Sequence, residues 1–237
     1  MFLNSGCSIT LPQLPPFCPF PSANPYPASP FVLSGCLDSW QNYLDSDDSD
    51  FLLQAAVVHA QFELIHPFMD GNGRIGRILI PLFLYKKEVL SQPMFYLSEY
   101  LESNRDEYYE RLQLISKCGD WNGWIAFFLK AVEEQARRNG QRVREIMELY
   151  DGMKLRVQDA TRSQYSIYLV DSIFSKPIFK SSDLIRQFSD QHGIHRQTAF
   201  ELLKRLRDAE ILQELRPGRG SRSAVLCFPE LIVLAQG

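Results

Sequence analysis

The sequence predicts a mainly α-helical protein, in which a helical bundle is followed by a small winged helix–turn–helix domain. Two observations favour this fold class. Over most of the chain, apolar residues recur at the three- and four-residue spacing of amphipathic helices. Near the C-terminus, two short apolar runs flank a loop of Arg, Pro and Gly, which is typical of a β-hairpin after a helix–turn–helix. A length of 237 residues has room for one large domain or two small ones.

The overall composition excludes several classes of protein. Charged residues make up 22% and hydrophobic residues 45% of the chain, and the formal net charge is -3. Neither general disorder nor a global basic field for nucleic acid is therefore expected. No stretch approaches the roughly 20 apolar residues of a membrane-spanning helix, so no membrane partner is expected. The five irregularly spaced cysteines favour free thiols in a reducing, cytoplasmic location.

Changes in composition divide the chain into four segments. Residues 1–36 are expected to form a proline-rich, uncharged leader, because residues 1–35 hold eight of the 14 prolines and no Asp, Glu, Lys or Arg. Residues 37–138 then form a helical domain. Residues 139–164 belong to a charged, exposed connecting helix, and residues 165–237 form the winged helix.

Helical periodicity and capping residues place the elements of the first domain. A helix over residues 51–65 is apolar nearly all round and follows an acidic turn of good N-cap residues, so it is expected to be central and buried. The helix over residues 74–87 has one apolar stripe and contains Pro81, which is expected to kink it. The other helices are expected at residues 37–44 and 105–116, after Asp120 toward Arg138, and at residues 135–158.

The C-terminal segment has a different order of elements. A turn at His192 and Gly193 is expected to separate two helices, and the loop RPGRGSR to join two strands. The expected elements are helices over residues 167–174, 181–188 and 196–210, and strands over residues 211–215 and 223–228.

Residues 66–77, with the sequence HPFMDGNGRIGR, carry the strongest chemical signal. The glycines on either side of Asn72 permit the positive φ angles of a backbone anion nest, which opens directly into the N-terminus of the predicted helix. Free backbone N–H groups and the helix dipole favour a phosphate there. Arg74 and Arg77, one turn apart, have the forked guanidinium groups that suit phosphate oxygens.

Two further side chains complete the pattern. Asp70 beside a phosphate site is a natural ligand for Mg²⁺, which prefers one or two carboxylates together with phosphate oxygens. His66 is the side chain in this stretch that exchanges a proton near neutral pH. A base, a metal-binding carboxylate and a phosphate cradle within one short segment predict the attack of a hydroxyl on a nucleotide phosphate.

Two other interpretations of this stretch are weaker. The sequence GNGRIG matches the dinucleotide fingerprint GxGxxG, but that fingerprint follows a β-strand, and here a helix is predicted to precede it. A Gly-rich turn between helices with capping charges would need no function. It leaves the combination of His66, Asp70, Arg74 and Arg77 unexplained.

The stretch resembles the signature of the Fic family, HxFx(D/E)GNGRxxR, at every defined position, and the likeness covers about residues 37–138. The sequences AQFELI before it and YLS and NRDEYY after it are also similar to the family. The resemblance implies an adenylyltransferase whose catalytic domain is residues 37–138. Such an enzyme transfers AMP from ATP, with Mg²⁺, to a Ser, Thr or Tyr hydroxyl of a target protein or of itself.

The resemblance also implies a role for each residue of the motif, with positioning and charge neutralisation as the basis of catalysis. The resemblance implies that His66 is the general base and Asp70 the Mg²⁺ ligand. Gly71, Asn72 and Gly73 would bind the α-phosphate and its developing charge. Arg74 and Arg77 would bind the β- and γ-phosphates.

Two features depart from the family pattern. Family members normally have helices and a β-hairpin flap before the region equivalent to residue 37, so the leader is expected to reflect a truncation or a replacement of that part. The family's inhibitory motif is Ser or Thr, three residues, Glu, and then Gly or Asn. It has no match, because Glu102 is followed by Ser103 and Glu107 by Tyr108. The chain is therefore expected to lack this inhibitory segment or to receive its Glu from a partner chain.

DNA is one expected partner of the C-terminal domain, because a recognition helix over residues 195–208 and a basic wing can reach phosphates and a groove. The candidate DNA contacts are Arg196, Gln197, Lys204, Arg219 and Arg222. Winged helices also serve as protein-interaction or dimer modules, so a partner protein and a second copy of the chain remain alternatives. Two other functions also stay open: an inactive family member that acts as a DNA- or protein-binding regulator, and an enzyme that transfers another nucleotide or phosphocholine or that removes AMP.

Overall fold

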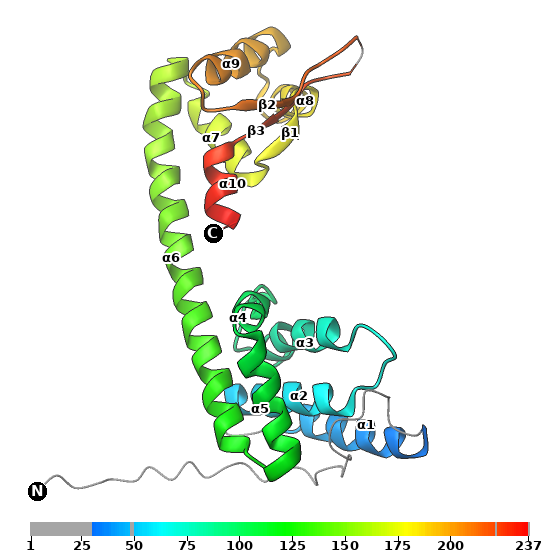
Figure 1. Ribbon diagram of the computed structural model, residues 1–237. Helices are drawn as coiled ribbons and strands as arrows, with labels where there is room; N and C mark the ends of the chain where they lie inside the picture. Colours follow the sequence, from blue (N-terminus) through cyan, green and yellow to red (C-terminus); the bar gives the residue numbers. More distant parts are fainter. Residues whose placement is uncertain (1–29, 48–49, 221, 237) are drawn as a thin grey trace, which may run out of the picture. The chain divides into compact units, whose positions relative to one another are not determined.

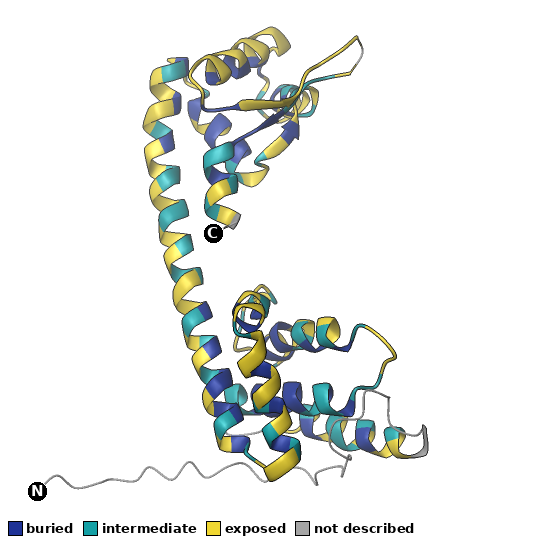
Figure 2. Cartoon of the chain, viewed as in Figure 1, coloured by how far each residue is buried: buried dark blue, intermediate teal, exposed yellow. Residues whose placement is uncertain are grey.

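Helices make up most of the described residues before Arg138 in the computed structural model, which describes residues 30–47, 50–220 and 222–236 (Figure 1). The chain divides after Arg137 into two compact units. Each unit has its own hydrophobic core, whose residues are among those drawn in dark blue in Figure 2. The mainly α-helical class expected from the sequence is confirmed.

The first unit is organised around its second helix. Its described elements are α1 (Pro30–Asp45), α2 (Phe51–Ile65), α3 (Asn72–Lys86), α4 (Ser98–Ser103), α5 (Arg105–Cys118) and the beginning of α6 (Trp121–Thr161). Helix α2 contacts α1, α3 and α5. The carboxylate of Asp50 accepts hydrogen bonds from the backbone N–H groups of Leu52 and Leu53, at 2.8 and 3.1 Å. It therefore caps α2 as the sequence predicts.

Two indole groups bind neighbouring helices to the backbone of α2. The N–H of Trp124 on α6 donates to the carbonyl of Ala56, and that of Trp40 on α1 donates to the carbonyl of Val58, each at 2.9 Å. Each bond satisfies the polar group of a large side chain that packs in the core. The apolar sequence of α2 thus becomes the buried helix against which its neighbours pack.

Several helix boundaries differ from those expected. Helix α1 begins at Pro30, inside the segment expected to be an irregular leader. Proline is tolerated in the first turn because its missing N–H would have no partner within the helix. The rest of that leader, residues 1–29, lies outside the described residues. Helix α3 begins two residues earlier than expected, at Asn72, and continues through the buried Pro81. Helix α4 has no counterpart among the expected helices.

One long helix, α6, replaces two expected ones. It runs without a break for 41 residues. The Asp120 carboxylate accepts a hydrogen bond from the N–H of Gly123 at 2.9 Å, which is the N-cap that the sequence predicts. The first turns of α6 bury Trp124 in the core of the first unit, whereas Met153 near its end belongs to the core of the second. The last turns of the expected connecting helix are therefore buried on one side rather than exposed.

The second unit has a helix–turn–helix followed by a hairpin, as expected. Its remaining elements are α7 (Ser166–Ser175), β1 (Ile178–Lys180), α8 (Ser181–His192), α9 (Arg196–Asp208), β2 (Gln213–Arg216), β3 (Val225–Cys227) and α10 (Pro229–Gln236). The strands form an antiparallel sheet in the order β1–β3–β2. Gly193 ends α8 with a φ of 63°, at the turn that the sequence predicts. Strand β1 and helix α10 were not predicted, because a three-residue strand carries no recognisable alternation.

The cysteines follow the expectation only in part. Cys118 and Cys227 are free, whereas Cys36, which is buried in α1, is disulfide-bonded. In the described part of the chain, no helix has the length and apolar character needed to span a membrane.

A buried histidine connects three helices of the first unit. The Nδ1–H of His59 on α2 donates to the carbonyl of Gly76 on α3 at 3.0 Å, and Nε2 accepts from the hydroxyl of Tyr108 on α5 at 3.1 Å. This assignment of the proton follows from the carbonyl, which can only accept. Burial lowers the pKa of His59 to about 4, because the charged imidazolium would lose its hydration.

We expect His59 to make the first unit less stable in acid. A base whose pKa is lowered by folding contributes stability above its unfolded pKa, and this contribution is lost as the pH falls from about 6.5 toward 4. Between pH 7 and pH 5 the wild type should lose about 2 kcal/mol more than a His59→Gln variant. Urea unfolding followed by Trp fluorescence measures this, because all three Trp residues lie in the first unit. The same loss in both proteins would contradict the assignment.

Candidate active site

The motif predicted to carry the chemistry forms the loop between α2 and α3. His66 is the first residue of this loop and caps the C-terminus of α2. Its backbone is left-handed, with φ 50° and ψ 57°. Its N–H donates to the carbonyl of Phe62 at 3.1 Å and so ends α2. Gly71, with φ 84°, stands directly before α3. A left-handed conformation is unfavourable for a residue other than glycine, and such strain at His66 is typical of functional sites.

The side chain of Asn72 closes this loop. Its Oδ1 accepts from the N–H of Phe68 at 2.9 Å, and its Nδ2 donates to the carbonyl of Phe68 at 2.6 Å. The Asn72 side chain is buried and both bonds are partly buried, so leaving either amide group unpaired would be costly. The amide oxygen and one amide N–H are therefore used to hold the loop.

The backbone after Gly71 provides free donors. The first hydrogen bond of α3 runs from the N–H of Ile75 to the carbonyl of Gly71, at 3.0 Å. The N–H groups of Asn72, Gly73 and Arg74 precede that bond, so they have no partner within the helix. They lie at the positive end of the α3 dipole, where an anion is favoured.

A cleft of about 300 Å³ lies over this helix start. Its lining on the motif side is His66, Met69, Asp70, Gly71, Asn72, Gly73, Arg74 and Arg77. All seven residues singled out from the motif thus line one cleft. The opposite wall, which sequence reasoning missed, is Glu102, Arg105 and Tyr109 from the end of α4 and the start of α5. The four-residue spacing of Arg105 and Tyr109 on one helix face was the available signal.

Charged groups of both signs lie in the cleft. The Oδ2 of Asp70 lies 3.3 Å from Nη2 of Arg74, and its Oδ1 accepts from the N–H of Gly71 at 2.7 Å. On the opposite wall, Arg105 lies 3.6 Å from Glu102, and its guanidinium lies over the ring of Tyr109 at 5.7 Å. These ion pairs are exposed and therefore weak, so an incoming anion or cation can displace them at little cost.

Asp70 has the chemistry of a ligand for Mg²⁺ only together with substrate. Within the described ranges, no group of three or more His, Cys, Asp or Glu side chains could hold a metal ion. A single exposed carboxylate in a weak ion pair fits the usual Mg²⁺ site, in which phosphate oxygens and waters supply the other ligands. The residues present thus fit a Mg²⁺ that enters with a nucleotide.

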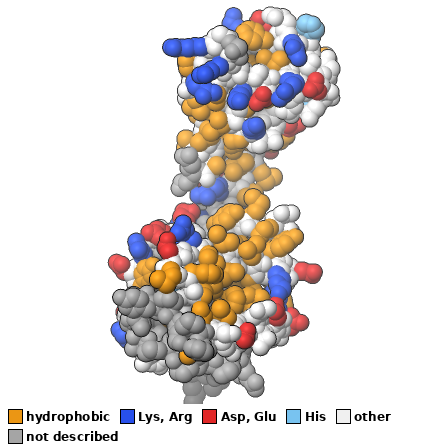
Figure 3. All heavy atoms as spheres, turned by 90° about the vertical axis from the view of Figure 1, so that its right-hand side faces the viewer, with side chains coloured by type: hydrophobic (Ala, Val, Ile, Leu, Met, Phe, Trp, Pro, Cys, Tyr) orange, Lys and Arg blue, Asp and Glu red, His pale blue; other side chains and the backbone are white. Residues whose placement is uncertain are grey.

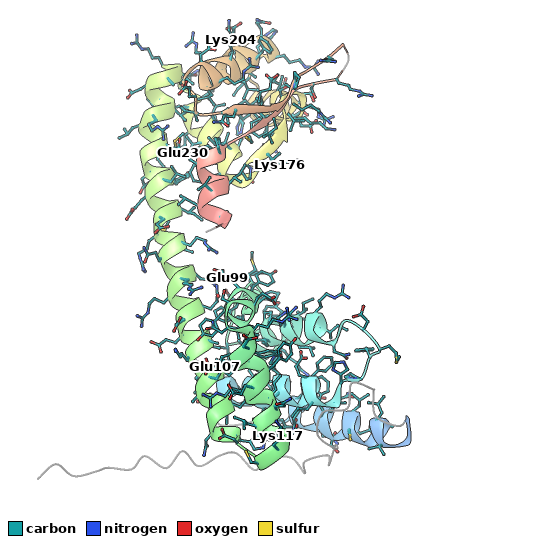
Figure 4. All side chains as sticks on the ribbon, viewed as in Figure 1. Glu99, Glu107, Lys117, Lys176, Lys204 and Glu230 are labelled. Carbon is teal, nitrogen blue, oxygen red and sulfur yellow. The ribbon has the colours of Figure 1, made fainter. Side chains whose placement is uncertain are left out.

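The predicted DNA contacts belong to the second unit. Arg196 and Gln197 lie in the first turn of α9, and Lys204 lies further along the same helix (Figure 4). Arg219 and Arg222 are paired across the hairpin loop, where the N–H of each donates to the carbonyl of the other at 3.0 Å. All five side chains are exposed.

Comparisons with known proteins identify parts of both units. Residues 22–84 match the Fic/DOC family, and residues 149–222 match the C-terminal domain of SoFic-like protein adenylyltransferases. The chain is 32% identical over 81 residues, 34% of its length, to a probable protein adenylyltransferase of Aquifex aeolicus. It is 30% identical over 115 residues, 47% of its length, to a protein adenylyltransferase of Caenorhabditis elegans. The aligned part spans 25% and 21% of these relatives.

One solved structure is also similar. A crystal structure of a Fic family protein from Desulfovibrio desulfuricans G20 aligns with 85% of this chain and 56% of its own, at 18% identity and a TM-score of 0.42.

Gly76 allows α3 to lie close to α2, and we expect its replacement by Ala to destabilise the first unit. A Cβ there would lie 2.0 Å from Oε1 of Glu63 and 3.2 Å from Cδ1 of Phe62, so Gly76→Ala should cost about 1–3 kcal/mol of unfolding free energy. Gly35→Ala is the matched control, because that glycine lies within α1 with nothing within 4 Å. It should stabilise by up to about 1 kcal/mol. Equal effects of both changes in urea unfolding would show that the close approach does not matter.

Proposed function

We propose that this chain, which belongs to the Fic family, transfers AMP from ATP to a Ser, Thr or Tyr hydroxyl of a target protein or of the chain itself. The observation that supports this most is the cleft over the start of α3, which brings a histidine, a carboxylate, two arginines and free backbone N–H groups together. The names of the relatives, protein adenylyltransferases, support the same reaction.

The start of α3 is the proposed site for the α-phosphate. Its free N–H groups at residues 72–74 are held in place by the Asn72–Phe68 bonds, so they need no reorganisation as charge develops on the phosphate oxygens. Arg74 and Arg77 are the proposed partners of the β- and γ-phosphates, because guanidinium groups bind phosphate oxygens in pairs. Asn72 then acts mainly by positioning the loop.

His66 is the proposed general base. As the hydroxyl oxygen of the target attacks the α-phosphorus, a ring nitrogen of His66 takes the hydroxyl proton. The new bond joins the target oxygen to phosphorus, and the bond from phosphorus to the bridging oxygen of the β-phosphate breaks. Pyrophosphate leaves with its negative charge beside the two arginines. Mg²⁺ held by Asp70 would add positive charge beside the phosphates when it is bound.

We expect the chain to gain the mass of one AMP when it is incubated with ATP and Mg²⁺, provided that one of its own hydroxyls is accepted. His66→Ala should gain none, because the cleft would lose the imidazole that takes the hydroxyl proton. His192→Ala removes a histidine from the second unit and should gain AMP like the wild type. Intact-mass spectrometry of the three proteins measures this. AMP transfer by His66→Ala at the wild-type level would refute the proposed base.

DNA binding by the second unit is a second candidate function, and charge favours it. Residues 138–237 contain 16 Lys and Arg against 12 Asp and Glu, although the whole chain has an excess of acidic residues. Figure 3 shows Lys and Arg side chains gathered on the visible face of this unit. Arg219 and Arg222 stand at the tip of an exposed hairpin, where they can contact phosphates or a minor groove.

If the hairpin binds DNA, Arg219→Ala combined with Arg222→Ala should weaken binding to duplex DNA. It should also reduce the dependence of log K on log salt by about 2, because each phosphate contact releases about one counterion. Arg142→Ala combined with Arg144→Ala changes the charge equally on α6, outside α9 and the hairpin, and is the control. Fluorescence anisotropy across a salt series measures both slopes. Equal slopes in the two variants would argue against the hairpin as the contact.

A further inference from the structure

Glu63 is an acid behind the motif that the proposed mechanism does not use. It lies on α2, and its Oε1 is buried with no hydrogen-bond partner among the residues that the structure describes. The carboxyl group occupies the space that Gly76 leaves free on α3. Burial raises the pKa of Glu63 to about 7, and the positive charge of Arg77 acts in the opposite direction. A buried carboxyl oxygen without a hydrogen-bond donor is unfavourable. An interaction with a nearby positive charge would offset part of this cost.

Arg77 connects this acid to the cleft. It directly follows Gly76 on α3 and lines the cleft. Its charge acts on the pKa of Glu63 and also on those of His59 and Tyr108. The Nη1 of Arg77 lies 3.3 Å from the place where a Cβ on Gly73 would be, so the guanidinium reaches back over the first turn of α3. It therefore lies beside the free N–H groups of the helix start, while its charge also acts on the buried polar groups.

A guanidinium can serve both sides of such a site. It has five N–H donors in a planar fork, so one edge can face a carboxylate while the other faces a phosphate. A carboxylate behind it restricts the rotation of a long side chain, and less entropy is then lost when a phosphate binds in front. The Glu63 carboxyl group, which lies against Gly76 on α3, is placed to provide such a restriction.

We propose that Glu63 is a positioning residue that orients the guanidinium of Arg77 toward phosphates bound in the cleft. The assignment rests on the proposed function, because it needs a nucleotide whose β- and γ-phosphates reach Arg77. Glu63 acts through Arg77 and touches no reacting atom. Its effect on a nucleotide therefore depends on the presence of Arg77 and of those phosphates.

The test is a double-mutant cycle on nucleotide affinity, with ATP and AMP as probes. Isothermal titration calorimetry with the full chain and Mg²⁺ compares the wild type, Glu63→Gln, Arg77→Gln and the double variant. Glu63→Gln should weaken ATP binding by about fivefold to tenfold in the wild-type background and by less than about twofold in the Arg77→Gln background. AMP affinity should change by less than about twofold, because AMP lacks the phosphates that Arg77 binds.

Two more variants serve as controls. Glu133→Gln makes the same charge change at an exposed position of α6 that is not part of the cleft, and it should leave ATP affinity unchanged. Glu63→Asp keeps the carboxylate, so it should bind ATP more tightly than Glu63→Gln does. Trp fluorescence in urea checks that each variant is folded, and Glu63→Met, which also removes the carboxylate, takes the place of Glu63→Gln in the cycle if the Gln variant is not.

The possible failures are distinguishable. An equal loss for ATP and AMP, or an equal loss with and without Arg77, would show that Glu63 only supports the fold, and it would overturn the assignment. Tighter ATP binding by Glu63→Gln would show that the acid competes with phosphate for Arg77, and it would overturn it as well. If Arg77→Gln itself leaves ATP affinity unchanged, the proposed role of Arg77 is wrong, and the positioning role falls with it.

Discussion

The amide of Asn72 forms two hydrogen bonds with the backbone of Phe68, and the motif loop depends on them. The loop begins and ends at left-handed residues, His66 and Gly71, and a short exposed turn of this kind has many other conformations available to it. The buried amide selects one of them. It thereby fixes the N–H groups at the start of α3 relative to the imidazole at the end of α2.

The close packing of α2 against α3 holds the two helix ends that the loop connects. Gly76 has no side chain to separate the two helices, and its carbonyl accepts a hydrogen bond from His59. The polar groups enclosed nearby, His59, Glu63 and Tyr108, are each disfavoured in their charged form by burial. Burying them lowers the stability of the first unit, while it gives the motif a rigid base. Such a combination is common where a site must be held in one geometry.

Much of this arrangement could be predicted from the sequence, because it is local. The motif residues are consecutive, so they had to lie near one helix start, and the apolar run of α2 had to be buried. The opposite wall of the cleft could not be predicted, since Arg105 and Tyr109 reach the motif through tertiary packing. The same holds for Glu63, which sequence alone shows as one acid on an apolar helix. Helix α1 extends into the expected leader because proline is tolerated in a first helical turn.

The most direct test of this account is the effect of Asn72→Ala on ATP binding. ATP with Mg²⁺ is titrated into the variant and the wild type in a calorimeter, and both proteins are unfolded in urea. The two measurements distinguish an effect on ATP binding from an effect on folding stability. We predict that ATP affinity falls by about tenfold or more, because loss of about 1.4 kcal/mol of loop preorganisation has that effect, while the first unit still folds. If a folded Asn72→Ala variant bound ATP as tightly as the wild type, the buried amide would not hold the site, and the account would be wrong.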